Sequence, residues 1–346
     1  MKTKTSLGWA IVGASWMAER YMIEAIEAVG GNHCTGVFST SPERGREYAE
    51  RTGLPRAYAT YADLLTDRDV DVVYIGTTNE RHRNEAVAAA AAGRHVLCEK
   101  PLATTVADAV AMRDACVTAG VVMGTNHHLR AHATHRRMRE LVAAGAVGEV
   151  LSARVHHTRY LPEILQTWRL SDPEGGGIIL DITVHDTDTV RFILGDEVES
   201  VGAMSMQQGL ASGDVEDGVV GTMRLRSGVH VVFHEAFTHP HSDTGFEVHG
   251  TEGVLVGKDI MNPAPTGDVV LRRNDLLDEI IDVPDRDNPY ERTVAAFNAA
   301  IRGNGAPIAS AEDGIASLAV ALAVREAART GRAVTVPAIP AAPVRS

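Results

Sequence analysis

Short apolar segments alternate with helical patterns over the first 125 residues, and this alternation constrains the fold more than any other feature of the sequence. The apolar runs that predict buried strands are 8–13, 34–39, 69–78, 95–98 and 121–127. The intervening segments that predict helices are 16–29, 41–53, 80–92 and 105–120. Regular alternation of strand and helix is typical of a parallel, doubly wound sheet. We therefore expect an α/β domain over residues 1–125.

The pattern changes in the second half of the chain. The segments that read as β-hairpins are 215–238 and 245–258, and those that predict helices are 290–302 and 311–330. Ser227-Gly228 supplies the turn of the first hairpin. Antiparallel strands can leave one face of a sheet free to cover a ligand. Because 346 residues exceed one ordinary core, we expect a second, α+β domain over residues 126–346.

Composition excludes several classes of function. The net charge of −12 argues against binding to nucleic acid, which requires Lys and Arg to neutralise phosphates. No apolar stretch is long enough to span a bilayer, so no membrane partner is expected. Three cysteines give no disulfide framework.

The N-terminus resembles a secretion signal only in part. Lys2 and Lys4 precede an apolar run, as in a secretion signal, but Gly8 and Gly13 break that run, so a cytoplasmic protein is expected. The Pro/Ala-rich tail 336–346 is expected to fray, and the sequence does not determine the oligomeric state.

The loop after the first strand resembles a dinucleotide fingerprint, G-x-G-x-x-G/A, in which one glycine is replaced. Its three key positions hold Gly13, Ser15 and Ala18. Gly13 can make the tight turn, the small Ser15 lets the backbone approach a pyrophosphate, and Ala18 permits close packing of helix on strand. A turn without a ligand is the alternative, but the strand–loop–helix setting favours a Rossmann cofactor loop, with the pyrophosphate at the helix N-terminus.

The end of the second strand predicts which dinucleotide binds. Enzymes that use NAD usually carry a carboxylate there, whereas this chain has Ser39, Thr40 and Ser41, followed by Arg44. Hydroxyl groups and an arginine favour the 2′-phosphate of NADP(H). Glu43 is the one contrary charge and can point outward. The alternative is an ordinary helix cap by Ser41 with a solvated Arg44.

Two further motifs carry a resemblance to a known family. Glu99-Lys100-Pro101 follows the strand 95–98, and "TTNERH" follows the strand before it. Asp181 and His185 stand four residues apart in "GGGIILDITVHDTDT". With the altered glycine loop, these motifs resemble the glucose–fructose oxidoreductase / inositol dehydrogenase (Gfo/Idh/MocA) family. The resemblance implies a Rossmann domain followed by a domain with a large, mostly antiparallel open sheet.

The same resemblance implies the activity and the site. It implies oxidoreductase chemistry on a small neutral sugar, and within the family most closely NADPH-dependent reduction of the 2-keto group of 1,5-anhydro-D-fructose to 1,5-anhydro-D-mannitol. The catalytic residues are then Lys100, Asp181 and His185. The expected cofactor-binding residues are Gly13, Ala14, Ser15, Trp16, Met17, Ala18, Ser39, Thr40, Arg44, Thr77, Thr78, Asn79, His82, Glu99, Lys100, Asn126, His128, Trp168, Arg169 and Tyr290.

The chemistry of these side chains suits a carbonyl reduction. A helix that starts after Gly175–Gly177 places Asp181 and His185 on one face. Reduction needs a hydride from NADPH, a proton donor such as His185, and a positive charge such as Lys100 beside the developing alkoxide. Asp181 would orient the sugar or the imidazole. A buried structural histidine and a surface Asp–His pair are the alternatives to these roles.

Other readings of the sequence remain open. The spacing of His128, His132 and His135 is compatible with one helix face. No H-E-x-x-H motif, cysteine partner or carboxylate that could serve as a third ligand accompanies them, so we expect no metal. Trp168 can pack in the protein interior instead of contacting a ligand. Two other functions compete with keto-sugar reduction: oxidation of another sugar or of inositol with NAD, and a non-catalytic sensor that binds NADP.

Overall fold

The structure is a computed structural model that describes residues 6–273 and 278–343, so Lys2 and Lys4 lie outside the described residues. The chain forms two compact units. The first comprises the residues up to 127, with 290–315 and those from 339 onward; the second comprises 128–289 and 316–338. The units divide next to the predicted boundary at residue 126, but the segment 290–315 returns to the first unit.

The first unit is built on a parallel sheet of six strands in the order β3-β2-β1-β4-β5-β6. The strands are β1 Leu7–Val12, β2 Asn32–Phe38, β3 Ala57–Tyr58, β4 Val72–Ile75, β5 His95–Cys98 and β6 Met123–Thr125. Strand order reverses between β1 and β4. In a doubly wound sheet this reversal is where ligands bind, at the carboxyl ends of the strands. The predicted α/β class and parallel sheet are confirmed.

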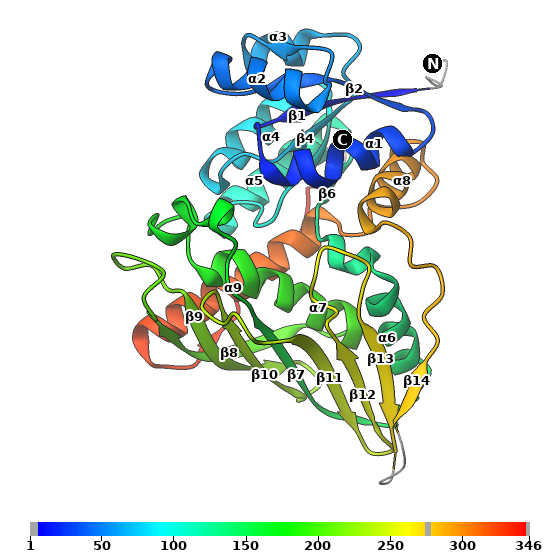
Figure 1. The fold of residues 1–346 in the computed structure, drawn as a ribbon, viewed down its shortest axis with the longest axis vertical. Coiled ribbons are helices and arrows are strands. Elements are labelled where there is room, and N and C mark those ends of the chain that lie inside the picture. Colours follow the sequence, from blue (N-terminus) through cyan, green and yellow to red (C-terminus); the bar gives the residue numbers. More distant parts are fainter. Residues whose placement is uncertain (1–5, 274–277, 344–346) are drawn as a thin grey trace. The chain divides into compact units, whose positions relative to one another are not determined.

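Helices surround this sheet (Figure 1). They are α1 Ile23–Ala28, α2 Pro42–Thr52, α3 Tyr61–Thr66, α4 His82–Ala91, α5 Val106–Ala119 and α8 Pro289–Ile301. Local sequence explains their ends: Ser41 caps α2 with its side chain, and Gly53 ends it with a φ of 73°. The predicted helix 16–29 instead begins with a π-helical turn, Ala18–Met22, because hydrophobic periodicity does not detect one extra residue in a turn.

The second unit contains a sheet of nine strands in the order β14-β13-β12-β11-β7-β10-β9-β8-β15. The strands are β7 Val150–Thr158, β8 Val198–Met206, β9 Gly218–Leu225, β10 His230–Ala236, β11 Thr244–Gly250, β12 Val254–Lys258, β13 Asp268–Arg272, β14 Glu279–Ile281 and β15 Val334–Thr335. Only β7 and β10 run parallel among these described pairs, and both predicted hairpins are present.

One face of this large sheet is covered by helices and the other is open (Figure 1). The helices are α6 Ala133–Ala143 and α7 Val184–Leu194, and α9 Ala311–Thr330 enters the unit from residue 316 onward. Strands β7 and β10 alternate accordingly: Val155 and Phe233 are buried, whereas Arg154 and Val232 are exposed. The large, mostly antiparallel open sheet is confirmed.

The C-terminal tail differs from its prediction. Arg113 is almost fully buried in the first unit, and its guanidinium donates to the carbonyl oxygens of Pro340 and Ala341, at 2.7 and 3.3 Å. The tail is therefore held as far as Ala341 rather than frayed, because a buried arginine needs acceptors and the backbone supplies them. No helix within 6–273 or 278–343 is long and apolar enough to cross a membrane.

Candidate functional site

The loop after β1 has the conformation that a tight turn requires. Gly13 has a φ of 100°, and a Cβ there would lie 2.8 Å from Thr77 Cγ2 and 3.0 Å from the carbonyl of Gly76. Only glycine fits this position without strain. Ser15 Oγ accepts a hydrogen bond from the backbone N–H of Ala18 at 3.3 Å, which ties the loop to the first residue of the π-helical turn Ala18–Met22. The tight turn at Gly13 is thus as predicted, and contact of a pyrophosphate with Gly13, Ala14, Ser15, Trp16, Met17 and Ala18 stays a prediction.

Arg44 is held against this loop. Its Nη2 donates to the carbonyl oxygen of Ala14 at 2.8 Å, and its backbone N–H donates to Ser41 Oγ at 3.2 Å. Ser41 therefore caps the helix, as the alternative reading supposed, but Arg44 is also anchored at the loop rather than solvated freely. One hydrogen bond leaves further N–H groups of the guanidinium to contact a ligand. Ser39 is buried beside Gly45, and Thr40 is exposed.

A second loop, after β4, is held by hydrogen bonds of polar side chains, of which His82 and Glu85 are buried. Thr77 Oγ1 donates to Glu85 Oε2 at 2.6 Å, and Thr78 donates to Glu80. The imidazole of His82 bridges the carbonyl oxygens of Thr77 and Pro101, at 3.1 and 2.9 Å. Burial lowers the pKa of His82, which these two carbonyls oppose. Through His82, the β4 loop supports the turn that follows Lys100.

Lys100 stands beside a buried carboxyl. Glu99 Oε1 accepts hydrogen bonds from Tyr74 Oη and from Asn126 Nδ2, each at 2.6 Å. Burial raises the pKa of Glu99, while these bonds and the charge of Lys100 lower it. Glu99 and Asn126, both predicted to contact cofactor, are therefore hydrogen-bonded to each other. Their bond joins the end of β5, next to Lys100, to the end of β6. Asn79 is buried in the same unit.

Tyr290 joins the first unit from the far end of the chain. Its ring stacks on Tyr21 with centroids 4.7 Å apart, and Tyr21 meets the edge of Trp16 at 5.6 Å. Tyr290 is almost fully buried. Trp16, Tyr21 and Tyr290 thus pack ring against ring. This packing brings Tyr290, 277 positions after Gly13 (290 − 13), to the segment that follows the glycine loop.

In the second unit, three successive glycines precede the segment that carries Asp181 and His185. Gly177 has a φ of 88°, and a Cβ there would lie 2.2 Å from Glu216 Oε1. That carboxylate oxygen accepts from the backbone N–H of Ile179 at 3.2 Å. Gly177 N also donates to Arg169 O at 2.8 Å. The glycines therefore let the segment pass closely between Glu216 and the Trp168–Arg169 turn.

We expect Gly177→Ala to destabilise the protein by about 1–3 kcal/mol, because alanine is strained at this φ and has no space beside Glu216. Gly195→Ala is the matched control, since Gly195 also has a positive φ of 66° but no atom within 4 Å of an added Cβ. Thermal unfolding of both variants measures the difference. Equal losses of stability would mean that space at Gly177 is not limiting.

Asp181 and His185 lie in one continuous helical segment, but not in one α-helix. Asp181 belongs to a π-helical turn, Ile179–Thr183 (η6), and α7 begins only at Val184. The predicted α-helix over both residues is thus corrected at Asp181. Asp181 Oδ2 lies 3.5 Å from Arg169 Nε, and the guanidinium of Arg169 covers the ring of Trp168 at 4.7 Å. Trp168 and Arg169 are therefore grouped with Asp181.

His185 lies at the end of a row of histidine rings. The ring of His128 meets it edge-on with centroids 5.2 Å apart, His132 lies 6.1 Å from His128, and His135 lies 5.5 Å from His132. Burial lowers the pKa of His132 to about 4 and that of His135 well below its usual range. In the described part of the chain no group of His, Cys, Asp and Glu has the geometry of a metal site. These histidines form a packed row of rings instead.

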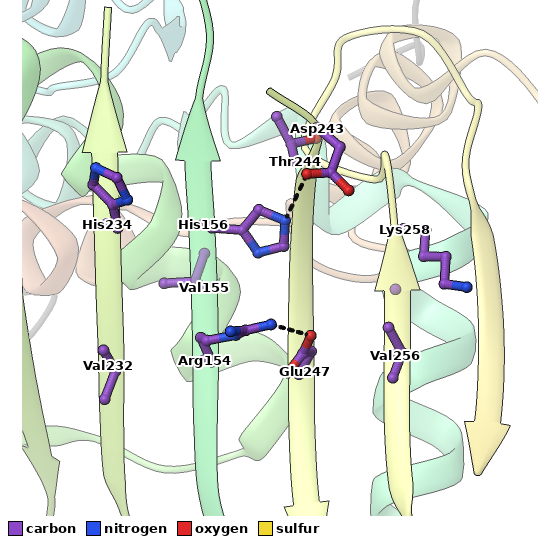
Figure 2. Close-up of a pocket in the computed structure, with 11 residues that line it drawn as sticks. Arg154, Val155, His156, Val232, His234, Asp243, Thr244, Glu247, Val256 and Lys258 are labelled. Carbon is purple, nitrogen blue, oxygen red and sulfur yellow. Dashed lines mark hydrogen bonds and ion pairs between the residues drawn. The ribbon is translucent and has the colours of Figure 1, made fainter. Parts of the chain in front are cut away.

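The open face of the sheet carries a separate depression of about 400 Å³ (Figure 2). Its charged side chains have ionic partners: Arg154 Nη2 lies 2.5 Å from Glu247 Oε1, and His156 Nε2 lies 3.6 Å from Asp243 Oδ1. Lys258 Nζ lies 4.0 Å from Asp278 Oδ2, which does not line the depression. None of the predicted site residues lines it. The depression therefore gives no support for a second ligand.

Sequence reasoning missed several buried polar residues. Glu216, which is half-buried, holds the start of the segment that carries Asp181 and His185, and the buried Asp186, His157 and Glu235 form a cluster beneath that segment. A signal was present for two of them, because His157 and Glu235 occupy inward positions of alternating strands, where an apolar residue is expected. A charged residue at an inward-facing position of a strand indicates a buried network of hydrogen bonds.

Comparison with known proteins agrees with this fold. The domain described as "Oxidoreductase family, NAD-binding Rossmann fold" matches residues 7–127. The domain described as "GFO/IDH/MocA C-terminal domain" matches residues 135–256. The first unit is thus an NAD(P)-binding Rossmann domain.

Individual relatives cover nearly the whole chain. 1,5-Anhydro-D-fructose reductase of Ensifer adhaerens is 50% identical over 94% of this chain and 97% of its own length. D-Xylose 1-dehydrogenase (NADP(+)) 2 of Haloferax volcanii is 28% identical over 94% of this chain and 98% of its own. The structure of aldose-aldose oxidoreductase from Caulobacter crescentus, complexed with glycerol, superposes with a TM-score of 0.86 at 28% identity, covering 95% of this chain and 99% of that one. Fold, motifs and these similarities together establish that the chain belongs to the GFO/IDH/MocA family of oxidoreductases.

Proposed function

We propose that this protein reduces 1,5-anhydro-D-fructose to 1,5-anhydro-D-mannitol with NADPH. The observation that carries the proposal is the 50% identity to a 1,5-anhydro-D-fructose reductase over 94% of the chain. Lys100, Asp181 and His185, the residues that the chemistry needs, are all present. We further propose that the first unit, the residues up to 127 joined by 290–315, is the cofactor domain and that the second unit, 128–289 with 316–338, is the substrate domain of a cytoplasmic enzyme.

The surroundings of Arg44 favour NADPH over NADH. None of Ser39, Thr40 and Ser41 at the end of β2 carries the carboxylate that repels a 2′-phosphate. Arg44 is anchored beside the glycine loop by its bond to Ala14 O. Glu43 is exposed on the first turn of α2. A guanidinium, hydroxyl groups and the lack of a carboxylate at positions 39–41 together suit a phosphate dianion.

Three side chains have different roles in the reduction. Bound NADPH supplies the hydride. Lys100 places a positive charge at the substrate oxygen, where negative charge develops in the transition state. His185 donates the proton to that oxygen, and Asp181, next to Arg169, orients the sugar or the imidazole.

The arginines of the second unit favour an uncharged substrate. Both residues suited to hold a phosphate or carboxylate are already paired: Arg130 makes two bonds to Asp188, at 2.7 and 2.8 Å, and Arg169 lies 3.5 Å from Asp181. Neutralised arginines offer little attraction to an anion. Hydrogen-bonding side chains such as Asp181 and His185 suit sugar hydroxyls and discriminate against analogues that lack them.

The test is oxidation of NADPH by the purified protein with a panel of keto-sugars. We expect turnover with 1,5-anhydro-D-fructose, a mannitol-configured product identified by NMR, and little oxidation of myo-inositol with NAD. Efficient inositol oxidation without turnover of the anhydro-ketose would contradict the proposal and identify an NAD-linked dehydrogenase. Tight NADPH binding without turnover of any sugar would identify a sensor.

A further inference from the structure

Beneath the segment that carries His185 lies a cluster of four buried polar side chains that the proposed reaction does not use. His157 is on β7, Glu235 on β10, Thr183 at the end of the π-helical turn and Asp186 in the first turn of α7. All four are at most 3% exposed. His157 and Glu235 are directly paired in the parallel register of β7 and β10, so their side chains project from the same face of the sheet.

The contacts join the sheet to the helical segment on both sides of His185. His157 Nδ1 lies 2.8 Å from Asp186 Oδ1. The hydroxyl of Thr183 donates to Glu235 Oε2. Thr183 precedes His185 by two residues and Asp186 follows it directly. Each side of the turn is therefore attached to a different strand.

The two carboxyl groups of the cluster require a proton. Asp186 Oδ2 and Glu235 Oε1 are buried and, within the described residues, have no hydrogen-bond partner when both groups are ionised. Burial, then the charge of Asp186, raises the pKa of Glu235 well above its usual range; the hydrogen bond from Thr183 lowers it, and the carboxyl group of Asp186 as a hydrogen-bonding neighbour raises it again. A proton held by Glu235 and donated to Asp186 satisfies both oxygens and leaves one negative charge instead of two. His157 faces the pair from β7, and His135 of α6 lies near His157.

We propose that Glu235 is a positioning residue for the proton donor: it shares one proton with Asp186 and, through Thr183 and Asp186, holds the turn that carries His185. The inference rests on the proposed function, in which His185 donates the proton. Glu235 itself contacts neither substrate nor cofactor in this scheme. Because a displacement of about 1 Å can lower a rate about 10²-fold, loss of the bridge should appear in kcat.

Glu235→Gln and Glu235→Ala form the first test. The glutamine amide can accept from Thr183 and donate to Asp186 without a proton of its own, so Glu235→Gln should keep kcat within about threefold of the wild type. Glu235→Ala removes the bridge and should lower kcat about 10–100-fold, with the Kd for NADPH unchanged. Equal losses in both variants, or none in Glu235→Ala, would overturn the proposal.

Thr183 provides a second pair in case Glu235→Ala does not fold. Thr183→Val keeps the shape of the side chain but removes the hydroxyl, and should lower kcat, whereas Thr183→Ser keeps the hydroxyl and should not. Full activity of Thr183→Val would contradict a role for this contact. In each variant, the NMR resonances of the His185 ring, assigned with His185→Asn, report its position without substrate: they should shift in Glu235→Ala and Thr183→Val only.

The shared proton has its own signature in stability. Because the pKa of folded Glu235 is raised, the stability from its protonation is fully present below the unfolded pKa and is lost as pH rises toward the folded one. Glu235→Gln has no proton to lose, so its Tm minus that of the wild type should increase by at least about 2 °C from pH 5 to pH 8. A constant difference would show that Glu235 is ionised. The Tm measurements and the NMR measurements need no substrate. They therefore still test the proposal if the wild type reduces no keto-sugar and the proposed function fails.

Discussion

Replacing His185 by alanine is expected to lower kcat for keto-sugar reduction by about 10²–10⁴-fold, the usual contribution of a general acid. Its ring lies in the second unit, 7% exposed, against the edge of His128. Because the first unit carries the NAD(P)-binding fold, the Kd for NADPH, measured by fluorescence titration, should stay nearly the same.

A control separates this effect from the general loss of a histidine. His230→Ala removes an exposed ring from the β10 strand of the same unit and should leave kcat unchanged. A normal kcat in His185→Ala would assign the proton donor elsewhere, to Lys100 or to a water. A large loss of NADPH affinity would mean that His185 contributes to binding instead of proton transfer.

Arg44→Ala should weaken the use of NADPH by about 10–100-fold and hardly change the use of NADH. A hydrogen bond to a charged group contributes about 1.5–3 kcal/mol, and each 1.4 kcal/mol is about tenfold in affinity. Arg44 also donates to Ala14 O, so its loss can disturb the loop for both cofactors. The ratio of kcat/KM for NADPH to that for NADH isolates the part that depends on the 2′-phosphate.

Arg46→Ala is the matched control, since Arg46 is an exposed residue of the same helix α2. Its variant should keep the wild-type preference. If Arg44→Ala loses activity equally with both cofactors, Arg44 has a structural role at the loop, and the specificity for NADPH requires another explanation.

Much of the first unit follows from local sequence. The strand 95–98 has the predicted bounds, and Ser41 and Gly53 mark the two ends of α2, because capping and left-handed backbone are properties of single residues. Hydrophobic periodicity indicated the parallel sheet. It did not detect the π-helical turns at Ala18–Met22 and Ile179–Thr183, since one additional residue hardly changes the pattern of apolar positions.

The sequence by itself determined the class of fold and the tight turn at Gly13, since each depends on residue type and on neighbours within one or two turns. The roles of Lys100, Asp181 and His185 stay predictions that rest on the family resemblance. Tertiary structure decided which polar groups meet across the chain: Arg44 with the carbonyl of Ala14, and Tyr290 with Tyr21. It also decided that Glu235, His157 and Asp186 share one buried space, although 29 residues separate the latter two. The pairing register of two strands and the packing of a helix on a sheet bring such groups together, and neither is encoded in local spacing.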